Sequence, residues 1–481
     1  MSHVVSVARG DGIGPEILDA VIRVLRAANA PLHFDEVRMG EQVYREGVAS
    51  GIDPTAWDSL RRTRVLLKAP ITTPQGGGVK SLNVTLRKSF GLFANVRPCL
   101  ALAPYVPTAH PGMNLVIVRE NEEDVYAGIE HRQTDEVVQC LKLISRPGSE
   151  RVIRYAFEYA RRKGRRRVTC MTKDNIMKLT DGLFHRLFDE IGAEYPELQR
   201  EHLIVDIGAA RVAASPERFD VIVLPNLYGD ILSDVAAEVA GSVGMAASAN
   251  LGEHGAMFEA VHGSAPDIAG RNLANPSGLL GAAVMMLRHL GEHAVARTIH
   301  DAWLCTIEEG IHTADIATPA HTEDCTSTSG FAAAVIRRLG RQPRRLASTP
   351  EGSAALADAI QRPRPTTPAR KELVGVDLFL HWSEGDRDPD ALARQVRGLA
   401  DGLGLELAMI TNRGTKVWPD GLPETFCTDH WRCRFQAKSA VHHGAVVALL
   451  GRAADIGLDF IKTEHLYTFD GVPGFSLGQG Q

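Results

Sequence analysis

The chain has 481 residues, of which 44% are hydrophobic, so it can bury large cores and is expected to form two or three domains. Its net charge of −5 argues against a general nucleic-acid binder. Its seven cysteines include no CxxC pair, which argues against a disulfide framework or a zinc site. Without a secretory signal or a membrane-length apolar run, we expect a reduced, cytoplasmic protein with no membrane partner.

Strand and helix patterns alternate from about residue 3 to residue 340, which predicts an α/β fold. Apolar runs predict strands, and amphipathic segments predict helices between them. The clearest strands are expected within residues 4–8, 64–70, 114–121, 167–173, 202–208 and 219–225, and the clearest helices within residues 14–28 and 149–164.

The alternation stops at residues 341–371, where Pro, Ser, Thr and Arg are frequent and a linker is predicted. Residues 372–481 then follow the order βαββαβ, which predicts a small ferredoxin-like α+β domain. That fold alone does not define a function. His442 and His443, on its second expected helix, are interpreted as surface or packing residues.

The sequence NLYGDILSD, at residues 226–234, directly follows an apolar strand. A glycine is expected to turn the chain, and a helix to start at Asp230 with Asp234 on the same face of its first turn. Carboxylates are favoured at a helix N-terminus, and two hard oxygen donors suit Mg²⁺ or Mn²⁺. The alternative is a capping Asp beside a solvated Asp. Asp206, at the expected end of another strand, is a candidate third ligand.

The N-terminal sequence GDGIGPE, at residues 10–16, lacks GxGxxG spacing, and no acidic residue clearly follows a second strand. A Rossmann dinucleotide site is therefore not expected. The glycines permit a tight turn with close backbone approach, so the segment is either a ligand-lining loop or a plain strand-to-helix turn.

Polar residues in the segment from Ser81 to Arg119 are candidates for an anion site. Ser81 fits a helix N-cap, and Arg87 follows Asn83 by four residues, so both lie on one helix face. Arg87, Arg97 and Arg119 offer three guanidinium groups that can bind several carboxylates. The alternative is a set of surface arginines in salt bridges.

Tyr126 and Lys173 are candidates for proton transfer, because a tyrosine or lysine can donate and accept a proton once its site perturbs its pKa. Each residue taken alone is unremarkable in its sequence context.

Taken in order, these motifs resemble the metal-dependent β-decarboxylating dehydrogenases. GDGIGPE, SxNxxLR, VREN with YAGIEH, KxNIMK, NxxGDxxSD and HGSAPDIAG follow the family's order across residues 3–340. The polar pair Ser81 and Asn83 resembles the isocitrate-specific branch, since the isopropylmalate branch needs an apolar pocket there. The linker and the last unit resemble the bacterial members of that branch with a C-terminal extension.

The resemblance implies an isopropylmalate/isocitrate dehydrogenase-like two-domain fold. A large domain would comprise residues 1–92 and 241–340, and a small domain residues 93–240 with a dimer clasp near residues 127–170. The implied assembly is a homodimer, with the C-terminal domain available for a higher oligomer. In such a dimer, Lys173 and Asp206 would reach the active site of the neighbouring subunit.

The resemblance also implies the reaction: oxidative decarboxylation of isocitrate to 2-oxoglutarate and CO₂ in the tricarboxylic acid cycle, with Mg²⁺ or Mn²⁺. It assigns catalysis to Tyr126 and Lys173, isocitrate binding to Ser81, Asn83, Arg87, Arg97 and Arg119, and metal binding to Asp206, Asp230 and Asp234. It assigns cofactor binding to Thr72, Thr73, Asn175, His262, Gly263, Ser264, Ala265, Asp267, Ile268 and Asn275.

The expected cofactor is NAD. Asp267 and Ile268 stand where NADP-dependent bacterial members usually carry Lys and Tyr, and Ser215 stands where they often carry Arg. A carboxylate can accept hydrogen bonds from both ribose hydroxyls and repels a 2′-phosphate. The alternatives are NADP, a sister enzyme acting on homoisocitrate, isopropylmalate or tartrate, and a non-catalytic regulatory subunit. A regulatory subunit would have lost catalytic Lys, Tyr or Asp residues, which this chain retains.

Overall fold

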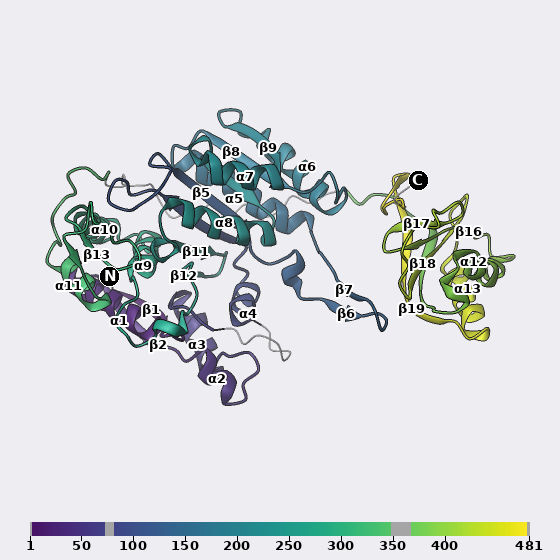
Figure 1. The fold of residues 1–481 in the computed structure, drawn as a ribbon, viewed down its shortest axis with the longest axis horizontal. Helices are drawn as coiled ribbons and strands as arrows, with labels where there is room; N and C mark the ends of the chain where they lie inside the picture. Colours follow the sequence, from purple (N-terminus) through teal and green to yellow (C-terminus); the bar gives the residue numbers. More distant parts are fainter. Residues whose placement is uncertain (1, 73–80, 348–366, 479–481) are drawn as a thin grey trace. The chain divides into compact units, whose positions relative to one another are not determined.

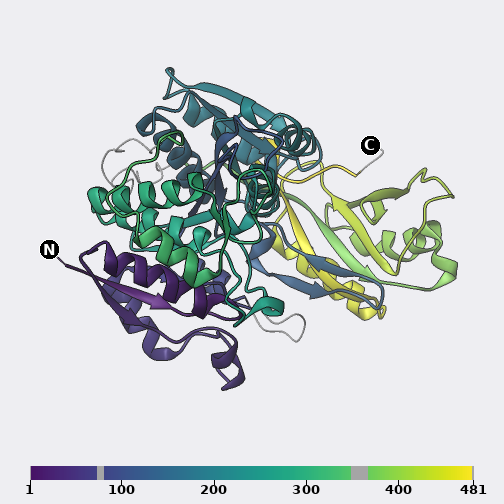
Figure 2. The same cartoon turned by 60° about the vertical axis from the view of Figure 1, so that its left-hand side comes forward.

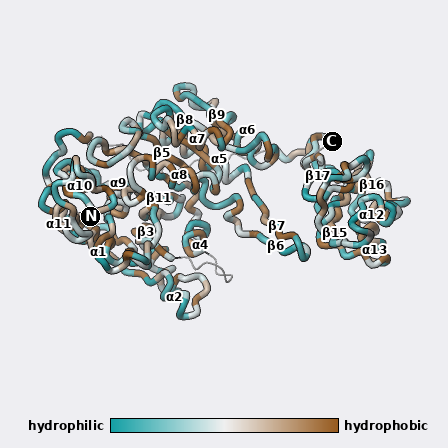
Figure 3. The backbone as a smooth tube through the Cα atoms, in the orientation of Figure 1, coloured by the Kyte–Doolittle hydropathy of each residue, from teal (hydrophilic) through white to brown (hydrophobic). Residues whose placement is uncertain are grey.

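The computed structural model describes residues 2–72, 81–347 and 367–478. The chain divides into two compact units, and Figure 3 shows hydrophobic segments within both. The first unit comprises Met1–Ala127 and Lys142–Pro363, and the second comprises Gly128–Leu141 and Arg364–Gln481.

The first unit is built on one ten-stranded sheet (Figure 1). Its central strands β12, β11, β4 and β5 pair antiparallel, and the strands on both sides of them pair parallel. From edge to edge the strands are β2 (Leu32–Glu36), β1 (His3–Ala8), β3 (Val65–Lys68), β12 (Ala256–Ala260), β11 (Ala247–Leu251), β4 (Ala94–Leu100), β5 (Asn114–Glu120), β10 (Val221–Leu224), β8 (Arg167–Thr172) and β9 (Gln199–Ile204).

Helices cover this sheet, as the α/β pattern predicted. They are α1 (Gly14–Ala27), α2 (Glu41–Arg45), α3 (Pro54–Thr63), α4 (Leu82–Ser89), α5 (Arg146–Arg162), α6 (Thr180–Gly192), α7 (Val205–Ala214), α8 (Asn226–Ala240), α9 (Ser277–His289), α10 (His293–Glu308) and α11 (Thr328–Ile336). Short 3-10 turns are η1 (Val125–Ala127), η2 (Pro216–Arg218), η3 (Val243–Met245) and η4 (Pro266–Ile268), and β13 (Ile311–His312) pairs with β14 (Asp324–Cys325).

The continuous apolar runs of the central strands reflect burial on both faces. In β5, Val116 and Val118 enter a core that α5 and α6 close, whereas Leu115 and Ile117 enter a second core beneath α7 and α8. Strand β10 divides its side chains in the same way. Helix α1 and helices α9 to α11 surround the largest core, which lies against β1 and β3.

Two details of the predicted elements were wrong. Helix α8 begins at Asn226 rather than Asp230, because Gly229 lies inside the helix where Arg119 packs against it. Asp230 is therefore beyond the first turn, and the expected stabilisation by the helix N-terminus does not apply. Asp206 lies in the first turn of α7, since β9 ends two residues earlier.

The C-terminal part of the second unit has the predicted βαββαβ order, and its ribbon runs from green to yellow in Figure 2. The middle of its antiparallel sheet has the order β16-β18-β15-β19, the ferredoxin-like arrangement, with β17 and β20 added at the edges. Its elements are β15 (Lys371–His381), η6 (Gly385–Arg387), α12 (Pro389–Val396), η7 (Arg397–Ala400), β16 (Glu406–Asn412), β17 (Thr415–Trp418), β18 (His430–Gln436), α13 (His443–Asp455), β19 (Asp459–Phe469) and β20 (Val472–Pro473).

A hairpin of β6 (Glu130–Arg132) and β7 (Val138–Cys140) belongs to this second unit, although it is inserted in the sequence of the first. Glu136 at its tip forms an ion pair with Arg387, with 2.6 Å between Oε1 and Nη2. Thr134 Oγ1 donates to the buried carboxylate of Asp429 over 2.5 Å. The hairpin is therefore tied to the C-terminal domain by side-chain contacts. Among the described residues, no helix is long and apolar enough to cross a bilayer.

Candidate active site

A cavity of about 300 Å³ in the first unit brings together polar side chains from distant parts of the sequence. Its walls come from β3, α4, β4, η1, α8 and β12. Among the residues that line it are seven of the expected substrate, catalytic and metal residues: Ser81, Asn83, Arg87, Arg97, Tyr126, Asp230 and Asp234.

Helix α4 carries the SxNxxLR residues into this cavity. Ser81 occupies the N-cap position as predicted, and its hydroxyl makes no capping hydrogen bond. Asn83 Oδ1 and Arg87 Nε are buried and have no hydrogen-bond partner within the described parts of the chain. Burying polar atoms without partners is costly. Their presence in a cavity therefore indicates that a polar ligand supplies the missing hydrogen bonds.

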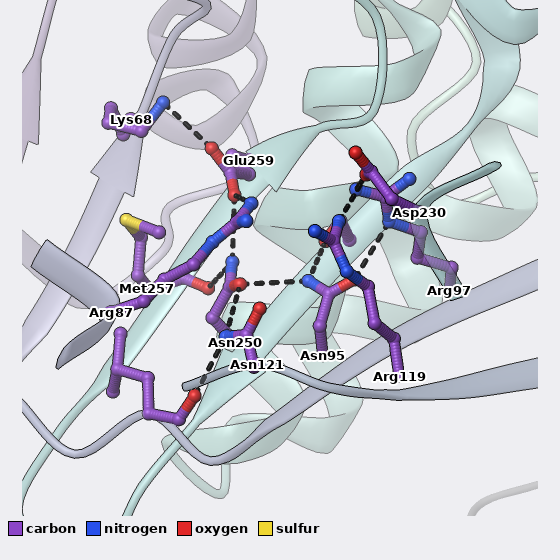
Figure 4. A network of polar contacts seen from close by, with 12 residues as sticks. Lys68, Arg87, Asn95, Arg97, Arg119, Asn121, Asp230, Asn250, Met257 and Glu259 are labelled. Carbon is purple, nitrogen blue, oxygen red and sulfur yellow. Dashed lines mark hydrogen bonds and ion pairs between the residues drawn. The ribbon is translucent and has the colours of Figure 1, made fainter. Parts of the chain in front are cut away.

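Lys68 and Glu259 form a buried ion pair at the cavity wall, with 2.7 Å between Nζ and Oε2 (Figure 4). They face each other across the parallel strands β3 and β12. Arg87 and Asn250 also donate to Glu259. Burial alone would raise the pKa of Glu259, but the cations Lys68 and Arg87 hold that pKa far below its usual range. Sequence analysis missed both residues, although a charged residue within an apolar strand is a usable signal.

Two buried arginines hold the carboxylates of α8. Arg97 contacts Asp234 at 3.0 Å and Asp230 at 3.4 Å, and Arg119 also forms an ion pair with Asp230 (Figure 4). Burial, with the neighbouring cations, lowers the pKa of Arg119 to about 10, so it remains charged at neutral pH. An ideal Cβ at Gly229 would lie 2.6 Å from Arg119 Cγ, which explains why glycine occupies this helical position.

Tyr126 reaches the same carboxylate from η1. Its hydroxyl donates to Asp230, and the guanidinium of Arg119 lies 4.9 Å from its ring centroid. Burial and the hydrogen bond to Asp230 raise the pKa of Tyr126, so the phenol stays protonated at neutral pH. A protonated phenol at the cavity wall has the form that a proton donor needs.

Lys173 and Asp206 lie elsewhere in the first unit and are not part of the cavity lining. Lys173 Nζ donates to Asp206 Oδ1 over 2.7 Å, and the carboxylate of Asp206 is exposed. Within residues 2–72, 81–347 and 367–478, the three expected metal ligands do not meet in one place. One chain thus supplies two hard carboxylate ligands, Asp230 and Asp234, to a cavity that suits Mg²⁺ or Mn²⁺ only in part.

Several expected cofactor residues meet at the N-terminal loop. The hydroxyls of Thr72 and Ser264 lie 2.6 Å apart, and the backbone N–H of Ile13 donates to Ser264 O. Asp11 accepts from the backbone N–H groups of Thr72 and Glu41, so its carboxylate holds this loop against its neighbours. Asp11 was not among the predicted site residues. The loop at residues 10–16 therefore lies beside expected cofactor residues, as the ligand-lining alternative requires.

The remaining cofactor candidates are dispersed. His262 and Gly263 line the cavity, and burial lowers the pKa of His262, which favours its neutral form. Ala265 precedes the turn η4, which contains Asp267 and Ile268. Asn275 donates to Asp315 over 3.0 Å, whereas Asn175 lies two residues after Lys173, apart from this group. Thr73 lies outside the described residues.

Comparison with known proteins identifies this architecture. Residues 4–335 match the isocitrate/isopropylmalate dehydrogenase family, and residues 371–481 match the C-terminal domain of bacterial isocitrate dehydrogenases. The chain is 51% identical to isocitrate dehydrogenase [NADP] of Rickettsia bellii, covering 99% of both chains. It is 44% identical to isocitrate dehydrogenase [NADP] of Thermus thermophilus, covering 99% of this chain and 96% of that one. The crystal structure of the TT0538 protein from Thermus thermophilus superposes with a TM-score of 0.93, at 44% identity and the same coverage.

These relatives contradict the expected cofactor. Enzymes matching nearly the whole chain are named for NADP, so the NAD expectation from Asp267, Ile268 and Ser215 is wrong. Asp267 and Ser215 are both exposed, and an exposed carboxylate repels a phosphate weakly because solvent and salt screen it. Basic residues also stand beside both positions. The backbone N–H of Ser215 bonds Arg211 O, and that of Arg271 bonds Ile268 O.

Members of this family use a nicotinamide cofactor and a divalent metal. The sequence match extends through the catalytic unit and the C-terminal domain, and the fold match covers both. The chain belongs to the isocitrate/isopropylmalate dehydrogenase family, as a bacterial isocitrate dehydrogenase with a C-terminal extension.

Proposed function

We propose that this protein catalyses the NADP-dependent oxidative decarboxylation of isocitrate to 2-oxoglutarate and CO₂, with Mg²⁺ or Mn²⁺. The observation that carries the proposal is the cavity in which Asn83 and Arg87 present buried polar atoms without partners. Lys68, Arg87 and Arg97 line this opening, where their charges meet the carboxylates of Glu259, Asp230 and Asp234. Isocitrate carries three carboxylates and a hydroxyl, so a carboxylate can accept from Arg87 Nε and the hydroxyl can donate to Asn83 Oδ1.

The carboxylates of α8 give the second requirement of the reaction. Asp230 and Asp234 are held by Arg97, and two hard oxygen ligands one helical turn apart suit a divalent cation. A bound divalent metal would acidify the substrate hydroxyl and favour loss of CO₂. We propose that Asp206 of a second copy completes this ligand set, because the described chain holds its own Asp206 outside the cavity.

The same reasoning places Lys173 in trans and makes the proposed active form a homodimer. In this scheme Asp206 accepts the hydroxyl proton, which is passed on through Lys173 as hydride leaves for the nicotinamide, and Tyr126 protonates the substrate carbon after CO₂ departs. The contact of Lys173 with Asp206 supports this pairing, since both would move together into a neighbouring site. Replacing Lys173 by Met should abolish turnover and leave isocitrate binding largely unchanged.

The NADP assignment rests on the relatives that match nearly the full chain. Two arginines are candidates for binding the 2′-phosphate of NADP. Arg211 and Arg271 adjoin the positions from which NAD was expected, and a guanidinium binds a 2′-phosphate bidentately. Replacing either arginine by Ala should raise the KM for NADP more than the KM for isocitrate. Unchanged NADP kinetics in the double variant would remove these residues from the proposal.

Steady-state rates with a substrate panel test the function as a whole. Isocitrate should be preferred over isopropylmalate, because the polar Ser81 and Asn83 disfavour its apolar side chain. Homoisocitrate and tartrate complete the panel. Chelation of divalent metal should stop the reaction. A chain that binds isocitrate yet turns over only in mixture with another subunit would instead be regulatory.

A further inference from the structure

Outside the cavity, one carboxylate and two imidazoles come together in the first unit. The candidate ligand atoms of Asp174, His185 and His202 all lie within 4.8 Å of one another. Within the described ranges of the chain, no other group of three His, Cys, Asp or Glu residues meets this spacing. All three residues are half-buried, so they are neither freely mobile surface groups nor closed to an ion from solvent.

Regular elements carry the two histidines, and Asp174 lies in the turn after β8. Asp174 follows β8, His185 lies on α6, and His202 lies on β9, where it pairs with Cys170 of the parallel strand β8. Helix α6 is anchored by apolar side chains such as Phe184 in the core that it shares with β8. Sites built on helices and strands hold their ligands more exactly than sites built on loops.

The polar contacts of the cluster are compatible with metal binding. His185 Nδ1 lies 2.6 Å from Asp174 Oδ2, and His202 Nε2 lies 2.9 Å from Thr172 Oγ1. The two imidazoles stack with 3.5 Å between ring centroids and 15° between ring planes. Asp189 Oδ2, at 3.6 Å from His185 Nε2, adds a further carboxylate.

We propose that Asp174, His185 and His202 form a binding site for a borderline transition-metal ion such as Zn²⁺. Two imidazoles and a carboxylate match the nitrogen and oxygen ligands that zinc takes in tetrahedral sites, whereas Mg²⁺ takes oxygen ligands. The site is chemically distinct from the all-carboxylate pair Asp230 and Asp234. The ligand atoms of a tetrahedral zinc with bonds of about 2.0–2.2 Å lie roughly 3.3–3.6 Å apart. Zinc must therefore replace the 2.6 Å contact of His185 Nδ1 with Asp174 Oδ2, and the stacked rings must rearrange.

The test uses the full chain, freed of metal and then given Zn²⁺ in the presence of excess Mg²⁺ and isocitrate. Competition with a chromophoric chelator should report one tightly bound zinc per chain. X-ray absorption at the zinc edge should show imidazole scattering from two histidines. This spectrum needs no variant, so the test holds even if a substitution prevents folding.

Variants then locate the ion. His185→Gln and His202→Gln should each weaken zinc binding by about tenfold or more, while His131→Gln, on the exposed hairpin, should not. Asp174→Asn supplies a third, nearly isosteric test. A spectrum with oxygen ligands only, or zinc affinity unchanged in the folded histidine variants, would overturn the proposal. Neither Lys173 nor Asp206 is altered, so the proposed reaction can fail without affecting this result.

Discussion

At the scale of single residues, the cavity pairs opposite charges but leaves Asn83 Oδ1 and Arg87 Nε without hydrogen-bond partners among the described residues. Asn83 and Arg87 could be found from the sequence because their spacing of four matches one helix face, and Ser81 because it fits the N-cap. Lys68 and Glu259 could not be paired in advance, since their contact depends on strands separated by about 190 residues in the chain, β3 and β12. The order of strands in the sheet, which brings them together, is a tertiary property that local spacing does not contain.

Tyr126 gives the first prediction. Replacing it by Phe removes the phenolic proton but keeps the ring that packs against Arg119. We expect kcat to fall by at least about 10²-fold, while the Kd for isocitrate stays within about threefold of the wild-type value. Calorimetric titration with isocitrate, beside initial rates, makes the comparison. Collapse of binding in a folded variant would show that Tyr126 positions the substrate instead.

Glu120 gives a prediction about pH. Burial raises its pKa to about 7, although the backbone N–H groups of Glu122 and Glu123 oppose the rise. Between its unfolded pKa of about 4.3 and pH 7 the native state binds the extra proton, so stability falls as pH increases through this window. Glu120→Gln should remove this loss, worth about 3 kcal/mol between pH 5 and pH 8 at about 1.4 kcal/mol per pH unit. Denaturant titrations at pH 5 and pH 8 measure it, and an unchanged pH slope would contradict the raised pKa.

At the scale of elements, apolar runs located most strands of the large sheet because burial on both faces leaves little ambiguity. The C-terminal βαββαβ order could also be predicted, because a Gly follows α12, β16, α13 and β19 within two residues. Helix α8 shows where such local signals fail: a glycine near a strand end usually indicates a turn, but Gly229 serves close packing with Arg119. The shifted helix start also places Asp230 and Asp234 one turn deeper, where Arg97 reaches both.

Gly229 therefore gives a prediction with a matched control. Alanine favours helices over glycine by about 1 kcal/mol, so Gly451→Ala in α13, where a Cβ meets nothing within 4 Å, should raise stability slightly. Gly229→Ala should instead lower the melting temperature and raise the KM for isocitrate, because its Cβ displaces Arg119. Thermal unfolding and initial rates compare the two variants. Equal stabilisation by both substitutions would mean that the Arg119 side chain can move away from residue 229 without a loss of stability.

At the scale of the whole molecule, the chain combines a catalytic unit with a second unit that also holds the hairpin of β6 and β7. This hairpin directly follows Tyr126 in the sequence. Its contacts with Asp429 and Arg387 therefore restrain the chain just after a candidate catalytic residue. No local sequence pattern could predict that grouping, because it joins residues separated by roughly 250 positions.

Truncation of the chain separates catalysis by the first unit from the contribution of the C-terminal domain to stability or assembly. A chain ending near residue 341 retains every proposed substrate, metal and cofactor residue, so we expect measurable turnover. It loses the partners of Thr134 and Glu136, so thermal stability or higher assembly should decrease. Light scattering, thermal unfolding and rate assays on the truncated chain check this. A folded, dimeric, metal-loaded truncation without any activity would show that the C-terminal domain takes part in catalysis.

The most direct test of the central proposal is the kcat/KM of the full chain for isocitrate with each nicotinamide cofactor, in saturating Mg²⁺. We expect 2-oxoglutarate as product and a preference for NADP over NAD of at least about tenfold, equivalent to about 1.4 kcal/mol. Absence of turnover with isocitrate, or a comparable preference for NAD, would contradict it.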